Sequence, residues 1–245
     1  MAMAKQIDAL FAAGLRPERV AVQYQPVRAC HDDTQWHYRS EALVRIAGDD
    51  GRLIPAGLFL PAVRRQRLLG ELDRLIVSKV MHHIAVHGPI AGGATAVNVS
   101  AESINAPEFV DWLCGQLAQQ PQVAKFLIFE VSEYAIIHRA EAVKAAMHRL
   151  REVGAHCAVD RFGQSTASVG FLRSVDIAFL KIDGSYTRGI MDSSDRQFFV
   201  QALVGIAHGL GIQVIAEYVE NEQEFNAVKS LMVDGAQGYF VGKPA

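Results

Sequence analysis

Short apolar runs alternate with longer amphipathic segments along most of the chain. The runs are rich in β-branched residues and have the length of single strands. Between them, apolar residues recur at intervals of three and four, which is typical of helices with one buried face. This alternation predicts βα units that build a parallel sheet. We expect strands at residues 20–26, 38–46, 94–100, 126–132, 156–160, 177–183 and 213–217, and a last one near 235–241.

The segments between the strands predict amphipathic outer helices at residues 71–87, 106–120, 139–154 and 194–211. Gly154 and Gly211 are placed to end two of them in left-handed geometry. Eight strands with intervening helices suggest a closed barrel, and the 245 residues match the roughly 250 of a typical α/β barrel. We therefore expect an α/β fold, a TIM-type (β/α)8 barrel, with residues 1–245 as a single domain.

Composition and charge narrow the function classes. Half of the residues are hydrophobic and a fifth are charged, which is ordinary for a folded domain. The formal net charge of -2 gives no reason to expect a nucleic acid polymer or a membrane surface as partner. Three scattered cysteines favour a reducing cytoplasm over a disulfide framework or a zinc site. No apolar run has the ~18 residues of a membrane span. We therefore expect a cytoplasmic domain that makes no membrane contact itself. Such a domain would also suit the cytoplasmic part of a membrane-anchored protein.

Polar residues follow the apolar part of most predicted strands. In a barrel the carboxyl ends of the strands converge, so acids from several strands would face one another. Carboxylate and amide oxygens are ligands of hard cations, which predicts a magnesium or manganese site. Taken singly, each acid is equally well explained as a helix cap or a solvated strand end, and the lysine as a member of an internal ion pair. The residues are Glu41, Asn98, Glu130, Asp160, Lys181, Asp183, Glu217 and Gln237.

Seven short motifs carry a family resemblance over nearly the whole chain. SEALVR, VNVS, FEVSE, VDRFG, FLKIDGSY, VIAEYVE and DGAQGYFVGKP occur in the order and approximate spacing of the EAL domain family. Each string is weak alone, but seven in order make a chance match improbable. The chain thus resembles an EAL domain, a variant of the TIM-type barrel. The resemblance implies binding of the bacterial second messenger cyclic di-GMP and, in active members, its opening to linear pGpG with two divalent metals.

The resemblance also implies roles for individual positions. Metal ligands are implied at Glu41, Asn98, Glu130, Asp160 and Glu217, for Mg²⁺ or Mn²⁺. Catalytic roles are implied at Lys181, beside the attacking water, and at Asp183, Glu217 and Gln237. Ligand-binding positions are implied at Gln25, Leu43, Arg45, Arg161, Glu220, Gly238 and Tyr239. A homodimer and a fused sensory or GGDEF-type domain are further expectations from the family.

Several positions depart from the family pattern. Arg161 stands where the second Asp of DDFGTGYSS is usual, a change of two charge units that should repel a second dication. The Thr and Gly that follow Phe162 and Gly163 in the family pattern are also replaced, by Gln164 and Ser165. Tyr218 replaces a usual Gly, and Gly184 a usual Arg. Two functions therefore stay open: a metal-dependent phosphodiesterase, or a catalytically weak receptor in which Arg161 supplies the missing charge. An enolase-type barrel enzyme is a third alternative, which the ordered motifs disfavour.

Overall fold

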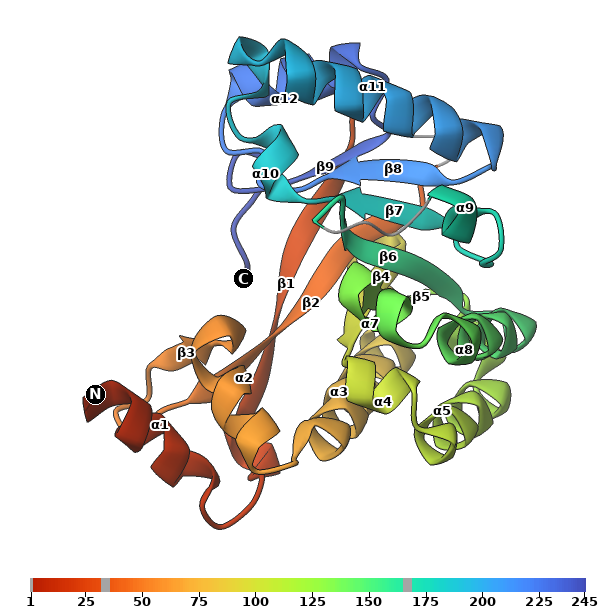
Figure 1. The fold of residues 1–245 in the computed structure, drawn as a ribbon. Helices are drawn as coiled ribbons and strands as arrows, with labels where there is room; N and C mark the ends of the chain where they lie inside the picture. Colours follow the sequence, from red (N-terminus) through yellow and green to blue (C-terminus); the bar gives the residue numbers. More distant parts are fainter. Residues whose placement is uncertain (1, 32–35, 165–168) are drawn as a thin grey trace.

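The computed structural model describes residues 2–31, 36–164 and 169–245 (Figure 1). Eight strands close into a barrel in the order β1-β9-β8-β7-β6-β5-β4-β2, and β1 pairs back to β2. The predicted TIM-type barrel is confirmed. The barrel strands are β1 (Val20–Ala29), β2 (Tyr38–Ala47), β4 (Ala94–Val99), β5 (Leu127–Ser132), β6 (His156–Phe162), β7 (Phe179–Ile182), β8 (Gln213–Ala216) and β9 (Gly235–Gln237).

One strand differs from the expected parallel arrangement. β1 runs antiparallel to both β2 and β9, whereas the other barrel pairs are parallel. Only residues 30–37 join β1 to β2, which is too short for a crossover helix. The β1–β2 ladder continues outside the barrel, where β3 (Leu53–Pro55) pairs with β2. Figure 1 shows α1 (Ala2–Phe11) and α2 (Ala56–Arg65) beside this outer half.

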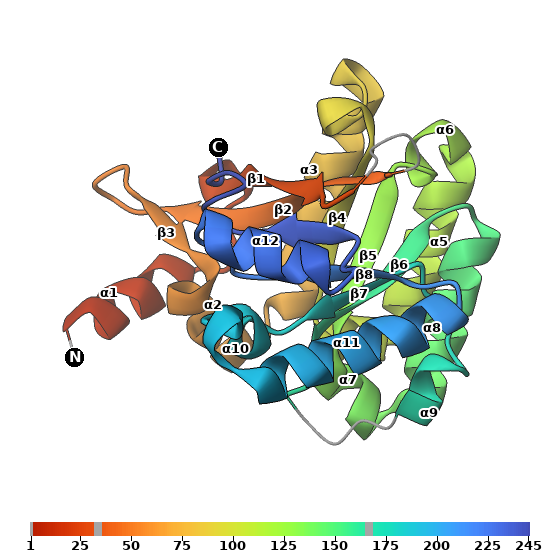
Figure 2. The ribbon, with the colours of Figure 1, turned by 90° about the horizontal axis from the view of Figure 1, so that it is seen from above.

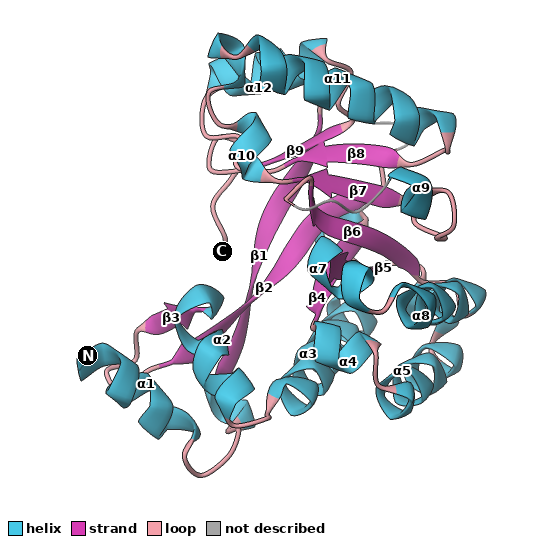
Figure 3. Ribbon diagram, viewed as in Figure 1, coloured by secondary structure: helices cyan, strands magenta, loops and turns pink. Residues whose placement is uncertain are grey.

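The long helices lie around the outside of the strands (Figures 2 and 3). They are α3 (Leu69–His87), α5 (Pro107–Gln119), α8 (Ala140–Glu152), α11 (Ser194–Gly209) and α12 (Glu222–Ser230), and the first four agree with the predicted segments within a few residues. Gly154 and Gly211 have φ of 89° and 74°, as predicted for residues that end helices. In the described part of the chain no helix is long and apolar enough to span a membrane. The shorter helices are α4 (Ala101–Ile104), α6 (Pro121–Ala124), α7 (Glu133–His138), α9 (Val169–Leu172) and α10 (Gly184–Thr187), with 3-10 turns η1 (Pro17–Arg19), η2 (Ile90–Gly92) and η3 (Ile190–Asp192).

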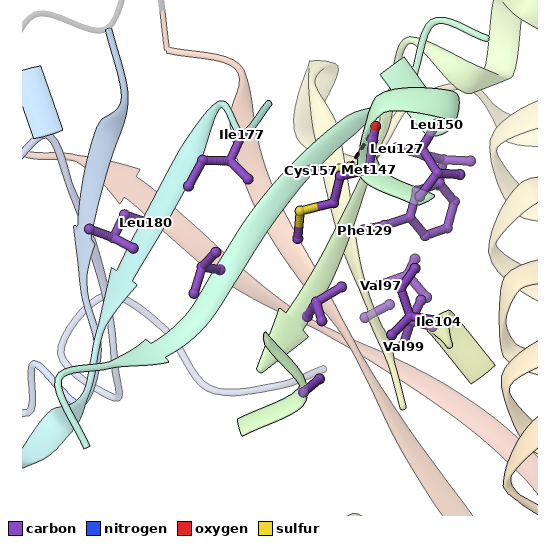
Figure 4. Packing of buried hydrophobic residues seen from close by; sticks show 14 of the residues in the cluster. Val97, Val99, Ile104, Leu127, Phe129, Met147, Leu150, Cys157, Ile177 and Leu180 are labelled. Atoms are coloured by element: carbon purple, nitrogen blue, oxygen red, sulfur yellow. Dashed lines mark hydrogen bonds between the residues drawn. The ribbon is translucent and has the colours of Figure 1, made fainter. Parts of the chain in front are cut away.

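Alternation along the strands divides the apolar side chains into two cores. The outward-facing set packs between strands and helices, and Figure 4 shows Val97 of β4 and Phe129 of β5 on the side of the sheet that faces Leu150 of α8. The inward-facing set fills the barrel, where the rings of Tyr38 and Phe179 meet edge to face at 5.2 Å. The inner core consists of Val27, Trp36, Tyr38, Ala94, Ala96, Ile128, Ala158, Phe179 and Ile215. The polar residues described below lie directly above this inner core.

Candidate functional site

The layer above the inner core is polar. Because side chains alternate along a strand, the residue two positions beyond an inward apolar residue also faces inward. Ile128 is followed in this way by Glu130, and Phe179 by Lys181. The same step leads from Ala96, Ala158, Ile215 and Gly235 to Asn98, Asp160, Glu217 and Gln237. Strand periodicity alone therefore gathers these polar groups at one end of the barrel.

Glu41 reaches the same layer through an irregularity in β2. Residues 38 and 41 would face opposite sides of a regular strand, but the register shifts between Tyr38 and Ser40. The shift lets Tyr38 stay in the inner core while Glu41 joins the polar layer. The Tyr38 hydroxyl donates a hydrogen bond to Glu130. Sequence reasoning missed Tyr38 because strict alternation places it opposite to Glu41.

The ammonium of Lys181 is the centre of the site. Its Nζ lies 2.9 Å from Glu41 Oε2 and 3.2 Å from both carboxylate oxygens of Glu130. Asp160 Oδ1 and Glu217 Oε1 are each 3.5 Å away. The lysine side chain is 1% exposed, so these contacts are shielded from water. Four acids from four strands thus surround one buried cation.

Amide side chains hold Glu41 in place. Asn98 Nδ2 donates to Glu41 Oε1 at 2.6 Å, and Gln237 Nε2 donates to Glu41 Oε2 at 2.7 Å. Gln237 also donates to Gln25 Oε1 at 3.2 Å, and Gln25 in turn donates to the Gly242 carbonyl at 3.1 Å. The chain from Gly242 to Glu41 therefore ties the C-terminal segment to the acid cluster.

Burial and neighbouring charges give the acids of the cluster different pKa values. Burial raises the pKa of Glu217 to about 8, and the charge on Asp160 adds to this. Burial also holds the pKa of Glu130 well above its ordinary value, against the lowering effect of Lys181. For Glu41 burial acts in the same direction, but the Lys181 charge and three hydrogen bonds outweigh it and lower the pKa. Burial lowers the pKa of Lys181, but the surrounding carboxylates more than reverse this, so it stays charged.

The side chains around Lys181 offer oxygen donors to a divalent cation. Among the described residues, no three Asp, Glu, His or Cys side chains form a ready ligand group, because Lys181 lies between the acids. Asp160 Oδ1 and Glu217 Oε2 are nevertheless buried without a hydrogen-bond partner. When they are ionised, the four acids outnumber the one ammonium, and their oxygen donors suit Mg²⁺ or Mn²⁺. The residues fit such an ion in charge and donor chemistry.

Arg161 adds a second positive charge at the edge of the cluster. It lies in a bulge of β6, where the register with β7 shifts between Val159 and Phe162, and its φ of 54° is left-handed. Its Nε is 3.5 Å from Asp160 Oδ2. Burial lowers the pKa of Arg161, but the charges of Asp160 and Glu217 outweigh this and raise it. The guanidinium therefore stands beside the two acids expected for a second metal; residues 165–168 of the altered loop lie outside the described residues.

A cavity of about 850 Å³ opens above the acids. Its walls come from the barrel mouth, from α2 and α3, and from the residues after β9. The volume is at the upper end of the range for small-molecule sites, about 300–1,000 Å³. Glu130 and Lys181 are fully buried beneath it. The predicted positions that line it are Gln25, Glu41, Leu43, Arg45, Asn98, Asp160, Arg161, Glu217, Glu220, Gln237, Gly238 and Tyr239.

Two other predicted positions have clear local roles. Asp183 accepts hydrogen bonds from the Ser185 backbone N–H at 2.9 Å and from Gln164 Nε2 at 2.7 Å, so it caps the start of α10. A Cβ on Gly238 would lie 2.1 Å from the Val219 carbonyl oxygen, so only glycine fits there. Asp183 thus serves as the N-cap of α10. Gly238 is required by the close packing of backbone at the pocket wall.

Comparison with known proteins gives one consistent family. The family model described as EAL domain matches residues 8–244. The cyclic di-GMP phosphodiesterase PdeF of Escherichia coli (strain K12) is 32% identical over 221 residues, which cover 90% of this chain and 29% of PdeF. The chain spans less than a third of the length of the first curated relatives that it matches.

Solved structures agree in fold. The PaMucR phosphodiesterase, in a c-di-GMP complex, superposes with a TM-score of 0.86 at 25% identity, covering 98% of this chain and 97% of that chain. The S helix-GGDEF-EAL structure of Vibrio cholerae LapD has a TM-score of 0.87 at 22% identity, covering 98% of this chain and 57% of that chain. At that identity the second likeness shows the fold alone.

Proposed function

This chain belongs to the EAL domain family, and on that premise we propose that its pocket binds cyclic di-GMP and that the acid cluster beneath hydrolyses it to linear pGpG. The observation that carries the proposal is the joint position of Glu41, Asp160 and Glu217 at the floor of an 850 Å³ cavity, with Lys181 between them. The cyclic di-GMP phosphodiesterase PdeF, as a relative, and the c-di-GMP bound in the PaMucR structure support the choice of substrate.

The proposed chemistry uses a divalent metal together with residues of this chain. Bound Mg²⁺ or Mn²⁺ would lower the pKa of a water and neutralise charge on a phosphoryl oxygen. Its ligands would come from Glu41, Asn98, Glu130, Asp160 and Glu217.

The chain's own groups would move protons and charge. In its ionised form Glu217, whose buried Oε2 has no hydrogen-bond partner, would accept a proton from the attacking water. The Lys181 ammonium would stabilise negative charge that develops on the phosphate. The water oxygen forms a new bond to phosphorus as one ester phosphorus–oxygen bond breaks, the leaving oxygen takes up the proton that Glu217 accepted, and the second phosphodiester remains.

The position of Arg161 favours a second candidate function, that of a receptor. Its guanidinium lies 3.5 Å from Asp160, where it could pair with a ligand phosphate in place of a metal ion. In that case the pocket binds cyclic di-GMP without useful turnover, and occupancy is transmitted to an attached domain or a partner.

One experiment separates the two candidates. The protein is incubated with cyclic di-GMP and Mg²⁺ or Mn²⁺, and pGpG is followed by chromatography while binding is measured in the same samples. The enzyme proposal predicts turnover that disappears in Glu41→Gln and persists in the control Glu141→Gln, an exposed acid in the first turn of α8. Binding without turnover, with pGpG formed only after Arg161→Asp, would make the chain a receptor. Absence of binding would refute both.

We further propose that residues 1–245 act as one domain of a longer cytoplasmic signalling protein that dimerises and carries a sensory or GGDEF-type domain. The partial coverage of the curated relatives and the GGDEF-containing LapD structure support this. Sedimentation of the full-length protein with and without cyclic di-GMP tests the dimer: a single-chain mass in both conditions would exclude it.

A further inference from the structure

Tyr218 combines an unusual backbone with an exposed aromatic ring. It directly follows Glu217, and its φ of 56° lies in the left-handed region that aromatic residues rarely adopt. The residue is 43% exposed, so burial does not explain why a strained residue stands there. Backbone strain of this kind concentrates at ligand-binding positions.

The ring is held from below and from one side. A Cβ on Gly184 would lie 2.3 Å from Cδ2 of Tyr218, so the ring occupies space that any larger residue at 184 would need. The Arg188 guanidinium carbon lies 4.3 Å from the ring centroid, a cation–π distance. Two departures from the family pattern, Gly184 and Tyr218, are therefore complementary in space and together fix the ring.

The fixed ring faces the ligand cavity. Tyr218 and Arg161 both line it, together with the acids Asp160 and Glu217 that directly precede Arg161 and Tyr218 in the chain. The two residues are near enough that Tyr218 contributes, after Asp160 and Glu217, to the raised pKa of Arg161. The mouth of the cavity thus presents an aromatic surface next to a guanidinium, above groups suited to a phosphate.

We propose that Tyr218 is a stacking platform that binds a purine base of the nucleotide ligand and so determines ligand affinity. The inference rests on the proposed function, because it assumes a nucleotide in this cavity. Aromatic side chains stack on bases, and a ring that is already fixed loses little conformational entropy when a base binds. The competing explanation is that the ring only fills the space above Gly184.

A matched pair of variants distinguishes these explanations. Tyr218→Phe keeps the ring, Tyr218→Leu removes it, and both keep a side chain in the left-handed backbone. Dissociation constants for cyclic di-GMP are measured by isothermal titration calorimetry, in EDTA and again in Mg²⁺, with the thermal unfolding midpoint as a check on the fold. We expect Tyr218→Phe to bind within about twofold of the wild type and Tyr218→Leu about tenfold more weakly. A third variant, Tyr218→Gly, relieves the strain but should also bind about tenfold more weakly.

Each contrary result has a distinct meaning. Wild-type affinity in Tyr218→Leu or in Tyr218→Gly would overturn the inference and leave the proposed function standing. An equal loss in Tyr218→Phe and Tyr218→Leu would assign the effect to the hydroxyl and overturn stacking. If the wild type does not bind cyclic di-GMP in either buffer, the proposed function fails and the inference fails with it.

Discussion

Replacement of Lys181 by methionine tests whether one ammonium holds the buried acid cluster together. Methionine is similar in length but uncharged, so the change removes the cation while filling most of its space. Lys181 contacts Glu41, Glu130, Asp160 and Glu217 at 2.9 to 3.5 Å, and its side chain is 1% exposed. Loss of one partner from a buried ion pair costs about 3–5 kcal/mol. With four acids left without the cation, we expect about 4–5 kcal/mol at pH values where the acids are charged.

The loss of unfolding free energy in Lys181→Met should depend on pH, and the raised pKa values of the acids determine the direction of that dependence. Burial already raises the pKa of Glu217 to about 8 and that of Glu130 well above its ordinary value. Without Lys181 these pKa values rise further, so the folded variant binds more protons than the unfolded chain, and its stability falls as pH rises. We therefore expect the difference from wild type to be about 2 kcal/mol smaller at pH ~6 than at pH ~8.5.

Urea unfolding followed by circular dichroism, in EDTA at both pH values, measures this difference. Lys229→Met, at an exposed position in the last turn of α12, is the matched control and should change stability by less than about 0.5 kcal/mol. A loss below about 1 kcal/mol for Lys181→Met at the higher pH, or an equal loss at both pH values, would refute the electrostatic reasoning.

Three further predictions address the core, the pocket wall and the raised proton affinity. Phe129→Ala, at a fully buried ring, should lower the free energy of unfolding by about 3–5 kcal/mol, whereas Phe198→Ala, at a side chain 74% exposed, should change it by less than about 0.5 kcal/mol in the same urea titration. Gly238→Ala should cost about 3 kcal/mol and weaken ligand binding in calorimetry, because its Cβ meets the Val219 backbone at 2.1 Å; wild-type stability would show that the wall can yield. The wild type should lose stability as pH rises from the ordinary carboxyl value of 4.5 through about 8, the raised pKa of Glu217, and Glu217→Gln should flatten that slope; equal slopes in urea titrations across this range would contradict it.

The sequence predicted most of the barrel because short apolar strand runs and amphipathic helix segments are local patterns. It located the strands and placed Glu130, Asp160, Lys181 and Glu217 at strand ends that converge, and their contacts show that they do meet. It did not give the direction of β1, since the same apolar pattern serves a parallel and an antiparallel strand. The short segment 30–37 was the available signal, because it has no room for a crossover helix.

The arrangement within the site depends on contacts that the pattern does not encode. Lys181 and Glu41 are 140 positions apart and meet only after the barrel closes. From sequence, a set of acids with one lysine predicts a metal site. In the structure the Lys181 ammonium lies among the acids and neutralises part of their charge. The side chain of Tyr38 joined the same cluster through a strand irregularity that has no compositional signature.

Consecutive residues line the cavity along β2 and also at the ends of β6 and β8. Side chains alternate across a strand, so Asp160 and Arg161 should face opposite sides, and so should Glu217 and Tyr218. All four line the cavity, and in each pair the second residue has positive φ. Left-handed backbone thus occurs at a guanidinium and at an aromatic residue of the cavity lining, each directly after an acid. Because non-glycine residues enter that conformation at a cost in free energy, the two groups are retained against backbone preference, which is the expected signature of side chains selected for contact with a ligand.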